Sequence, residues 1–330
     1  MDMALQSAPV QVRDDEQRAN ILRRFRIGDR TFNILTQASA IAVLVILAGV
    51  MLSLVIGSLP AWHAFGFDFF TSQSWNPVTE KFGALPAIYG TLLTSFIAML
   101  IGVPVSLGIA IFLTEICPER FRRTIGTAIE LLAGIPSIIY GIWGLFVFAP
   151  FFQAHLQPVL IDAFANIPIL NQLFAGPPYG IGLLTAGLIL AIMVLPFITS
   201  ITREVFDTVP PVLKEAAYGI GCTRWEVMRR VVIPYARVGI VGGVMLGLGR
   251  ALGETMAVTF VIGNAHRIVP PIMAPGTTIS ASIANEFTEA TGDLYTASLI
   301  ALGLILFFIT FVVLAAARLM LMRIAMKAGV

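Results

Sequence analysis

The chain has 330 residues, of which 57% are hydrophobic and only 12% are charged, and its mean hydropathy is +0.88. Soluble domains carry about 25% charged residues, so this composition excludes a water-soluble enzyme, and the abundance of apolar side chains excludes a disordered chain. The net charge of +2 gives no reason to expect nucleic acid as a partner. Two cysteines and three scattered histidines predict neither a disulfide framework nor a metal site.

Six stretches are apolar over the length of about 20 residues that a helix needs to cross a bilayer. They lie at residues 34–59, 85–115, 126–152, 180–202, 238–262 and 295–317. The first is too long for the apolar region of a cleaved signal peptide, so we expect a retained anchor. The sequence therefore predicts an all-α integral membrane protein with six transmembrane helices among membrane lipids. Its parts are an amino-terminal arm at 1–33, a six-span domain at 34–317 and a tail at 318–330.

The Lys and Arg residues indicate the orientation of these spans, because cytoplasmic connections carry an excess of positive charge. Eighteen of the 21 lie in the amino-terminal arm, the second and fourth connections and the tail. The outer connections hold only Lys81 and Arg267, and Arg250 alone lies inside a span. We therefore expect both termini in the cytoplasm, where Cys117 and Cys222 stay reduced.

The outer connections contain candidate surfaces for a partner outside the cytoplasm. Residues 60–84 are rich in Trp and Phe, which is more typical of the membrane interface than of a binding cage. Residues 153–179 lack Lys and Arg, and residues 264–294 hold two proline turns and a polar stretch at 277–289 compatible with a helix. The alternative is that these loops merely cap the bundle.

The third predicted span opens with a proline. Pro136 removes a backbone donor and loosens the helix, so freed carbonyls and the Ser137 hydroxyl are candidates to line a cavity. The alternative is a simple kink without contact to a ligand.

The connection at about 203–237 predicts a compact helical hairpin. Pro210 and Pro211 suit a helix start, and Gly219 and Gly221 suit its end. Within this helix Ala216 and Ala217 are small, so the surface of another protein is able to approach closely.

A second helix is expected to follow in the same connection. Thr223 and Glu226 have the spacing of a capping box, in which each side chain satisfies a free backbone N–H group. Pro234 is expected to end or kink this helix.

This connection resembles the EAA motif of bacterial ABC-importer permeases. The resemblance lies in Glu215-Ala216-Ala217, then Gly221 after three intervening residues, then Val231-Val232-Ile233-Pro234 after nine further intervening residues. In that family the segment is a cytoplasmic coupling helix that sits in a cleft of the ATP-hydrolysing subunit. The resemblance implies a coupling role for Glu215, Ala216, Ala217, Gly221, Thr223 and Glu226. The alternative is a solvated hairpin without a partner.

Two ionisable residues, Arg250 and Glu254, lie in the middle of the fifth predicted span. Each costs about 2.5 to 3.5 kcal/mol in a bilayer centre, so such residues face a protein interior or a wet cavity. Their spacing of four residues predicts that both lie on one face of the helix. Two interpretations follow. In one, they form a structural ion pair. In the other, Arg250 binds a dehydrated oxyanion by bidentate hydrogen bonds. Glu254 then orients Arg250 when the path is empty and competes with the anion for Arg250.

The same span contains small residues at intervals of four, Gly239, Gly243 and Gly247, continued by Ala251 and Thr255. Such a stripe predicts close helix packing, which places Arg250 in a crowded interface. The Thr255 hydroxyl is a further candidate group on the substrate path.

Residues 242–264, together with 130–141 and 223–226, resemble the PstC-type permeases of the bacterial phosphate ABC importer. The resemblance implies the type I importer permease bundle in the bacterial inner membrane, and ATP-driven import of inorganic phosphate. It implies a PstA-type permease as heterodimer partner, two PstB-type ATPase subunits and a PstS-type phosphate-binding protein. The sequence has no GxxxxGK[ST] loop, so ATP-Mg is expected on the partner ATPase, and we expect this chain to be a non-catalytic subunit that binds no cofactor.

Other readings stay open from the residues alone. Sulfate or molybdate suits the same positive centre. An ion-coupled secondary transporter would use intramembrane charges but needs no EAA loop, and inverted halves are not detected. An anion channel predicts flux independent of ATP.

Overall fold

The computed structural model describes the backbone of residues 9–327, in which helices are the only regular elements. The chain divides into two compact units, Met1–Ile56 and Gly57–Val330. Helix α1 (Pro9–Phe65) makes up the described part of the first unit and enters the second. Six helical segments have the length and apolar composition of membrane spans, which confirms the predicted number. They are Gly28–Phe65, Leu85–Ile116, Ser137–Phe164, Leu183–Asp207, Arg224–Leu252 and Asp293–Met320.

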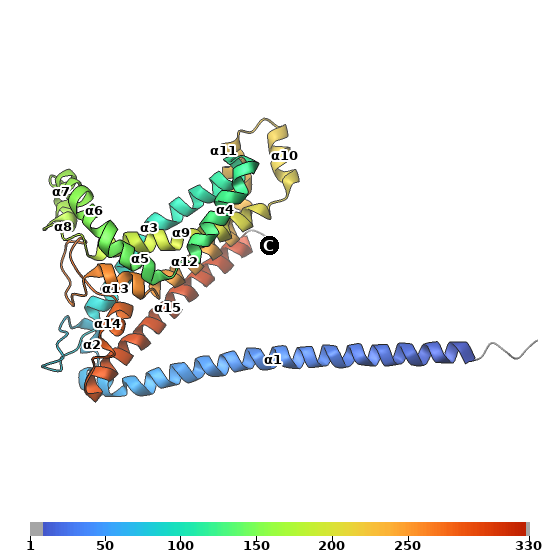
Figure 1. Cartoon of the computed structure of the whole chain (residues 1–330), viewed down its shortest axis with the longest axis horizontal. Coiled ribbons are helices and arrows are strands. Elements are labelled where there is room, and N and C mark those ends of the chain that lie inside the picture. Colours follow the sequence, from blue (N-terminus) through green and yellow to red (C-terminus); the bar gives the residue numbers. More distant parts are fainter. Residues whose placement is uncertain (1–8, 328–330) are drawn as a thin grey trace, which may run out of the picture. The chain divides into compact units, whose positions relative to one another are not determined.

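The second unit is shown in Figure 1, where α10 and α11 lie at one end and α2, α7 and α8 at the other. Its further elements, in chain order, are α2 (Asp68–Thr71), α3 (Leu85–Ile111), η1 (Phe112–Ile116), α4 (Glu119–Ala133), α5 (Ser137–Trp143), η2 (Gly144–Phe148), α6 (Ala149–Phe151), η3 (Phe152–Leu156), α7 (Gln157–Phe164), α8 (Pro168–Phe174), α9 (Leu183–Asp207), α10 (Pro211–Gly219), α11 (Arg224–Val227), η4 (Met228–Val232), α12 (Ile233–Leu252), α13 (Met256–Ile262), α14 (Ile279–Glu286) and α15 (Asp293–Lys327). The η segments are single π-helical turns within longer helices.

Helix α9 is the centre of the second unit. Of its most apolar stretch 67% is buried, against 33% or less for the other spans. The helix is apolar on nearly all sides, as expected for a helix surrounded by others. Gly102 of α3 faces Val194 of α9, and Gly187 of α9 faces Ile97 of α3. The absence of a side chain at these glycines lets the two helices approach closely.

The small-residue stripe on α12 packs against α9, which confirms the packing prediction. A Cβ atom on Gly243 would lie 3.0 Å from Ile201, and one on Gly247 would lie 2.7 Å from Ile198. Gly239 faces Val205 in the same way. The stripe therefore fixes the register of α12 on α9, and with it the position of Arg250.

The third span begins at Ser137 and not at residue 126 as predicted, because the helix breaks at Gly134–Pro136. Residues 119–133 form the separate amphipathic helix α4, and the span runs from Ser137 to Phe164. Pro136 has no backbone N–H group and disfavours helical geometry in the preceding residue, which accounts for the break.

The second helix of the predicted hairpin does not end at Pro234. It continues from Arg224 through η4 and α12 to Leu252, so this span starts earlier than predicted. The proline lacks the N–H group that would bond to Arg230, and the π turn at Met228–Val232 accommodates that loss without breaking the helix. The second helix of the hairpin is therefore continuous with the fifth span.

Candidate functional site

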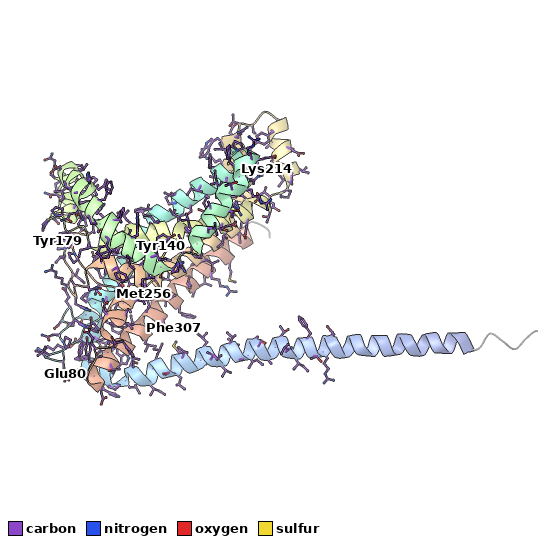
Figure 2. The ribbon with its side chains drawn as sticks, in the orientation of Figure 1. Glu80, Tyr140, Tyr179, Lys214, Met256 and Phe307 are labelled. Carbon is purple, nitrogen blue, oxygen red and sulfur yellow. The ribbon has the colours of Figure 1, made fainter. Side chains whose placement is uncertain are left out.

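Two helix breaks lie next to each other in the second unit. The first, at Gly134–Pro136, separates α4 from α5, and the second, at Gly253–Thr255, separates α12 from α13. The short helices that follow them, α5 and α13, pack face to face. A Cβ atom on Gly141 would lie 3.0 Å from the Cα atom of Ala257, so this glycine permits the close approach. Figure 2 shows Tyr140 on α5 and Met256 at the start of α13.

The continuous fifth helix predicted over 238–262 is therefore wrong. Helix α12 ends at Leu252 and α13 begins at Met256, with Gly253 and Glu254 between them. Glycine is unfavourable in a helix, and irregular backbone in a membrane protein is found where protein or water covers it. Arg250 therefore lies in the last turn before the break, and Glu254 lies within it.

Arg250 lies in the last turn of α12 and is half-buried. Its guanidinium carbon lies 4.4 Å from the centroid of the Phe197 ring of α9. Its Nε atom is buried and has no hydrogen-bond partner among the described residues. Within the same part of the chain the guanidinium forms no ion pair. An aromatic face, in place of a carboxylate, therefore supports this cation.

The predicted pairing of Arg250 with Glu254 is not found. Glu254 is only 9% exposed, and its Oε1 accepts a hydrogen bond from the backbone N–H of Ala257 at 3.3 Å. The break in the helix removes the regular i to i+4 geometry on which the pairing prediction depended. Glu254 instead satisfies a free N–H group in the first turn of α13.

The remaining predicted path residues flank these breaks. Ser137 is the half-buried first residue of α5. The Thr255 hydroxyl donates to the carbonyl of Gly253 at 3.4 Å. Tyr140, one helical turn beyond Ser137, donates from its hydroxyl to the carbonyl of Leu132 at 2.9 Å and so spans the first break.

Sequence reasoning missed Phe197 and Tyr140 as parts of this site. Phe197 directly follows Pro196, which interrupts the hydrogen-bond ladder of α9 near the level of Arg250. An aromatic residue next to a proline within a span was the available signal. The geometry leaves one half-buried guanidinium with free donors beside irregular backbone, an arrangement that can bind an oxyanion.

The first helix of the predicted hairpin forms as expected and is followed by Gly221. Helix α10 spans Pro211–Gly219, and Gly221 has a φ of +89°, a conformation that favours glycine. Glu215 and Ala216 are exposed. Ala217 is 8% exposed and packs into the chain's own core with Phe206 and Met228. The expectation that Ala217 lies on the surface open to another protein is therefore wrong.

The capping box that begins the next helix is confirmed. The backbone N–H of Thr223 donates to Glu226 Oε2 at 2.9 Å, and the backbone N–H of Glu226 donates to the Thr223 hydroxyl at 3.4 Å. An ion pair that the sequence did not predict ties α10 to the end of the second span. Lys214 Nζ lies 2.6 Å from Oε1 of Glu115, whose side chain is 10% exposed. Lys214 is labelled on α10 in Figure 2.

A polar network joins the connection at 60–84 to the connection at 264–294. Trp75 and Tyr295 each donate to Oε2 of Glu286 at 2.6 Å, and His266 Nε2 lies 2.6 Å from Oε1 of the same carboxylate. Burial acts to raise the pKa of Glu286, but the hydrogen bonds from His266, Tyr295 and Trp75 together hold the pKa below its ordinary value. Trp75 of the aromatic stretch at 60–84 thus packs against the connection at 264–294, with the rings of Trp75 and His266 stacked at 5.0 Å. Phe69 and Phe82 of the same stretch are buried, whereas Phe67 is 88% exposed.

No group of three or more His, Cys, Asp or Glu side chains among the searched residues is arranged to hold a metal ion.

The family model of the binding-protein-dependent transport system inner membrane component matches residues 106–325 of the chain. The phosphate transport system permease protein PstC of Mesorhizobium japonicum is 71% identical over 93% of this chain and 94% of its own length. The protein of the same name from Pasteurella multocida is 59% identical, covering 89% of this chain and 92% of that relative.

Solved structures with the same fold are more distant in sequence. A chain of the bacterial alginate ABC transporter, in complex with an alginate-bound periplasmic protein, aligns with a TM-score of 0.59 at 19% identity, covering 94% of this chain and 97% of that chain. A chain of the inward-facing MetNI methionine ABC transporter aligns with a TM-score of 0.53 at 17% identity, over 72% and 94% of the two chains. These structures show the type I ABC importer permease fold.

Proposed function

Because the chain belongs to the binding-protein-dependent transport system inner membrane component family and is a permease subunit of a phosphate ABC importer, we propose that Arg250 is its phosphate-binding group in the membrane. A multi-pass inner-membrane subunit of this class works together with other ABC components. The observation that carries the assignment to Arg250 is that, in the described part of the chain, no carboxylate pairs with this arginine, which lies beside two helix breaks.

The proposed binding step uses the geometry of α12 and α9. The planar guanidinium donates two parallel hydrogen bonds to phosphate oxygens and supplies the charge that replaces lost hydration. When the path is empty, the Phe197 ring holds the guanidinium in place. The hydroxyls of Ser137 and Thr255, which flank the two breaks, are proposed to add hydrogen bonds to the anion.

Glu254 has a different proposed role from the one that its spacing indicated. Its carboxylate keeps α13 in position through the bond to Ala257, and Arg250 keeps its full charge for the substrate. A phosphate ion bound to a partly exposed arginine without a second cation is held weakly, which allows release.

The sister subunit is proposed to be a PstA-type permease that supplies the other half of the path. Gly134 and Gly253, at the two breaks, are exposed on this chain, as is Met256 with 47% of its surface. A translocation path between two permeases requires such irregular backbone to face the partner or water.

Two PstB-type ATPase subunits are proposed to bind ATP-Mg and hydrolyse the nucleotide. This chain acts as the non-catalytic subunit that receives the motion. Glu215 and Ala216 offer an exposed face of α10 to the ATPase, and the buried Ala217 anchors that helix to the permease core. The helix that starts at the Thr223 cap runs without interruption to Arg250. A movement at α10 and α11 is therefore transmitted along this continuous helix toward the phosphate site.

The end of the second unit that holds α10 and α11 (Figure 1) is proposed to face the cytoplasm. Both termini are proposed to be cytoplasmic as well, because the arm and the tail are rich in Lys and Arg. The opposite end, with the outer connections joined by Glu286, is then available to a PstS-type phosphate-binding protein.

Reconstitution tests the proposed function as a whole. The chain is incorporated into vesicles with and without the sister permease, the ATPase and the binding protein, and uptake of labelled phosphate is followed. We expect uptake only with all partners and ATP inside. Uptake by this chain alone, without ATP, would contradict an importer subunit.

A further inference from the structure

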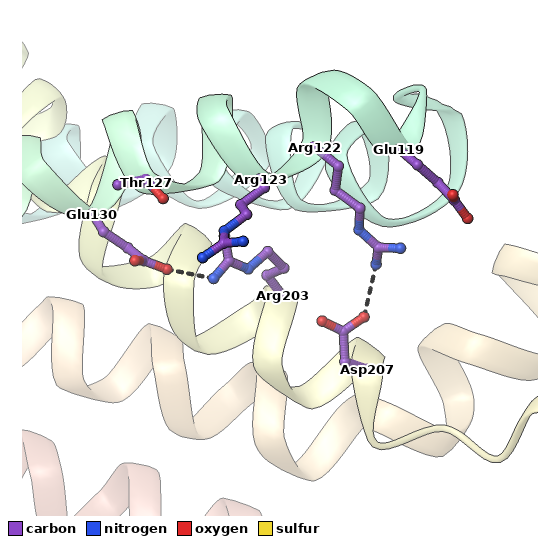
Figure 3. Close-up of a pocket in the computed structure, with 7 residues that line it drawn as sticks. All are labelled: Glu119, Arg122, Arg123, Thr127, Glu130, Arg203 and Asp207. Atoms are coloured by element: carbon purple, nitrogen blue, oxygen red, sulfur yellow. Dashed lines mark hydrogen bonds and ion pairs between the residues drawn. The ribbon is translucent and has the colours of Figure 1, made fainter.

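A hollow lined by charged side chains lies between α4 and the carboxyl-terminal end of α9, which precedes α10 in the chain (Figure 3). Its volume is about 410 Å³. The residues of α4 that line it are spaced by three and four, so they share one face of that amphipathic helix. The full lining is Glu119, Arg122, Arg123, Thr127, Glu130, Arg203 and Asp207.

Two ion pairs cross the hollow and account for two of its three arginines. Arg122 Nη2 lies 2.8 Å from Oδ1 of Asp207, and Arg203 pairs with Glu130. Arg123 projects into the same hollow and forms no hydrogen bond or ion pair with another residue among those described. The three arginines and the three carboxylates of the lining balance in charge, and Arg123 is the arginine for which the described residues show no ion pair.

The remaining acid, Glu119, shares a helix face with Arg123 but lies toward the opposite end of that face from Thr127. It lies four residues before Arg123 and eight before Thr127, about 6 and 12 Å along the axis at 1.5 Å per residue. An anion on the Thr127 side of Arg123 thus has the guanidinium groups of Arg123 and Arg203 and a hydroxyl within reach, and it is further from Glu119 than Arg123 is. Arginine is the side chain best suited to bidentate binding of phosphate oxygens.

Gly126 is what allows Arg203 to cross α4. It is buried in the middle of the lining face, and a Cβ atom there would collide with Nη1 of Arg203. Substitution of Gly126 would therefore displace Arg203 from the hollow without removing any charge.

Helix α9 connects this hollow to the intramembrane site. It carries Phe197, which supports Arg250, and Arg203 six residues later, about 9 Å further along the axis. Resting on the proposed function, we propose that the hollow is a second phosphate site, where Arg123, Arg203 and Thr127 bind phosphate as it leaves the path toward the cytoplasm. Phosphate accumulated in the cytoplasm occupies the same site and slows further import.

The same chemistry would serve free phosphate or the headgroup of an anionic phospholipid, so the experiment separates the two sources. The complete importer is reconstituted in phosphatidylcholine vesicles, with ATP and increasing phosphate trapped on the ATPase side and labelled phosphate with the binding protein outside. The measured quantity is the initial uptake rate. The comparison is repeated in vesicles that also contain phosphatidylglycerol.

We expect trapped phosphate to lower the uptake rate of the wild-type importer, and Arg123→Gln to need about 3- to 10-fold more trapped phosphate for the same inhibition, since a charge-assisted pair is lost. Gly126→Ala is expected to weaken inhibition in the same direction. Arg120→Gln is the matched control, because it removes the same charge from an exposed position of α4 outside the hollow.

The inference is overturned if trapped phosphate leaves the wild-type rate unchanged, or if Arg120→Gln and Arg123→Gln shift inhibition equally. It is also overturned if the effect of Arg123→Gln appears only with phosphatidylglycerol, which would assign the hollow to lipid. Uptake into vesicles without trapped phosphate reports on the proposed function separately.

Discussion

The guanidinium carbon of Arg250 and the ring of Phe197 lie 4.4 Å apart, and this contact takes the place that an ion pair with Glu254 was expected to hold. An aromatic face stabilises a cation without neutralising it. The charge in the membrane therefore remains available to an incoming anion, whereas a carboxylate at the same distance would compete with it.

Replacing Phe197 by Leu is expected to weaken phosphate transport through the position of Arg250. A cation–π contact contributes about 0.5 to 2 kcal/mol, which corresponds to a roughly 2- to 30-fold rise in the phosphate concentration for half-maximal uptake by the complete importer. Phe197→Tyr keeps the aromatic face and is expected to restore most of the affinity. Phe146→Leu, at a position 71% exposed on η2, is the control for loss of an aromatic ring. Equal uptake by Phe197→Leu and wild type would exclude a positioning role.

The ion pair between Lys214 and Glu115 is expected to hold the coupling helix on the second span. Reversing one charge, as in Lys214→Glu, leaves two carboxylates together where one is 10% exposed, so we expect loss of coupled transport. The double variant Lys214→Glu with Glu115→Lys restores the attraction. The measurement is uptake per ATP hydrolysed by the assembled importer. Failure of the double variant to recover any coupling would show that the pair has no role in holding α10.

Glu286 makes the outer connections sensitive to acid. Its pKa in the folded chain lies below the unfolded value of about 4.5, so its stabilising effect is complete above that pH and is lost as the pH falls through the lower folded value. The thermal unfolding temperature is thus expected to drop below about pH 4.5. Glu286→Gln, which cannot titrate, is expected to be less stable near neutral pH and to show a flatter acid dependence. Parallel profiles for the two proteins would rule out this carboxylate as the origin.

The sequence predicted well those features that depend on local chemistry. Apolar runs identified the six spans, the Thr223 and Glu226 spacing identified a cap that the structure confirms, and the glycine stripe identified the face of α12 that meets α9. These follow from hydrophobic length, side-chain reach and the lack of a Cβ atom, all of which can be read from neighbouring residues.

The arrangement at the breaks was harder to predict, for physical reasons. Residues 238–262 hold only two charged residues, Arg250 and Glu254, and so read as one span. Only the structure shows that α12 ends at Leu252 and that α13 begins at Met256. The partner of Arg250 lies 53 residues away on α9, beyond any local spacing rule. Lys214 and Glu115 are 99 residues apart and meet only because α10 folds back onto the second span.

Uptake by an importer that carries Arg250→Gln tests most directly whether Arg250 binds phosphate in the membrane. The variant is assembled with all partner subunits, the amount of complex is measured by copurification, and labelled phosphate uptake is recorded at saturating ATP. We expect normal assembly with uptake reduced about 100-fold or more, and partial uptake by Arg250→Lys, which keeps the charge but loses the bidentate geometry. Near wild-type uptake by a fully assembled Arg250→Gln complex would contradict the assignment of Arg250 as the phosphate-binding group.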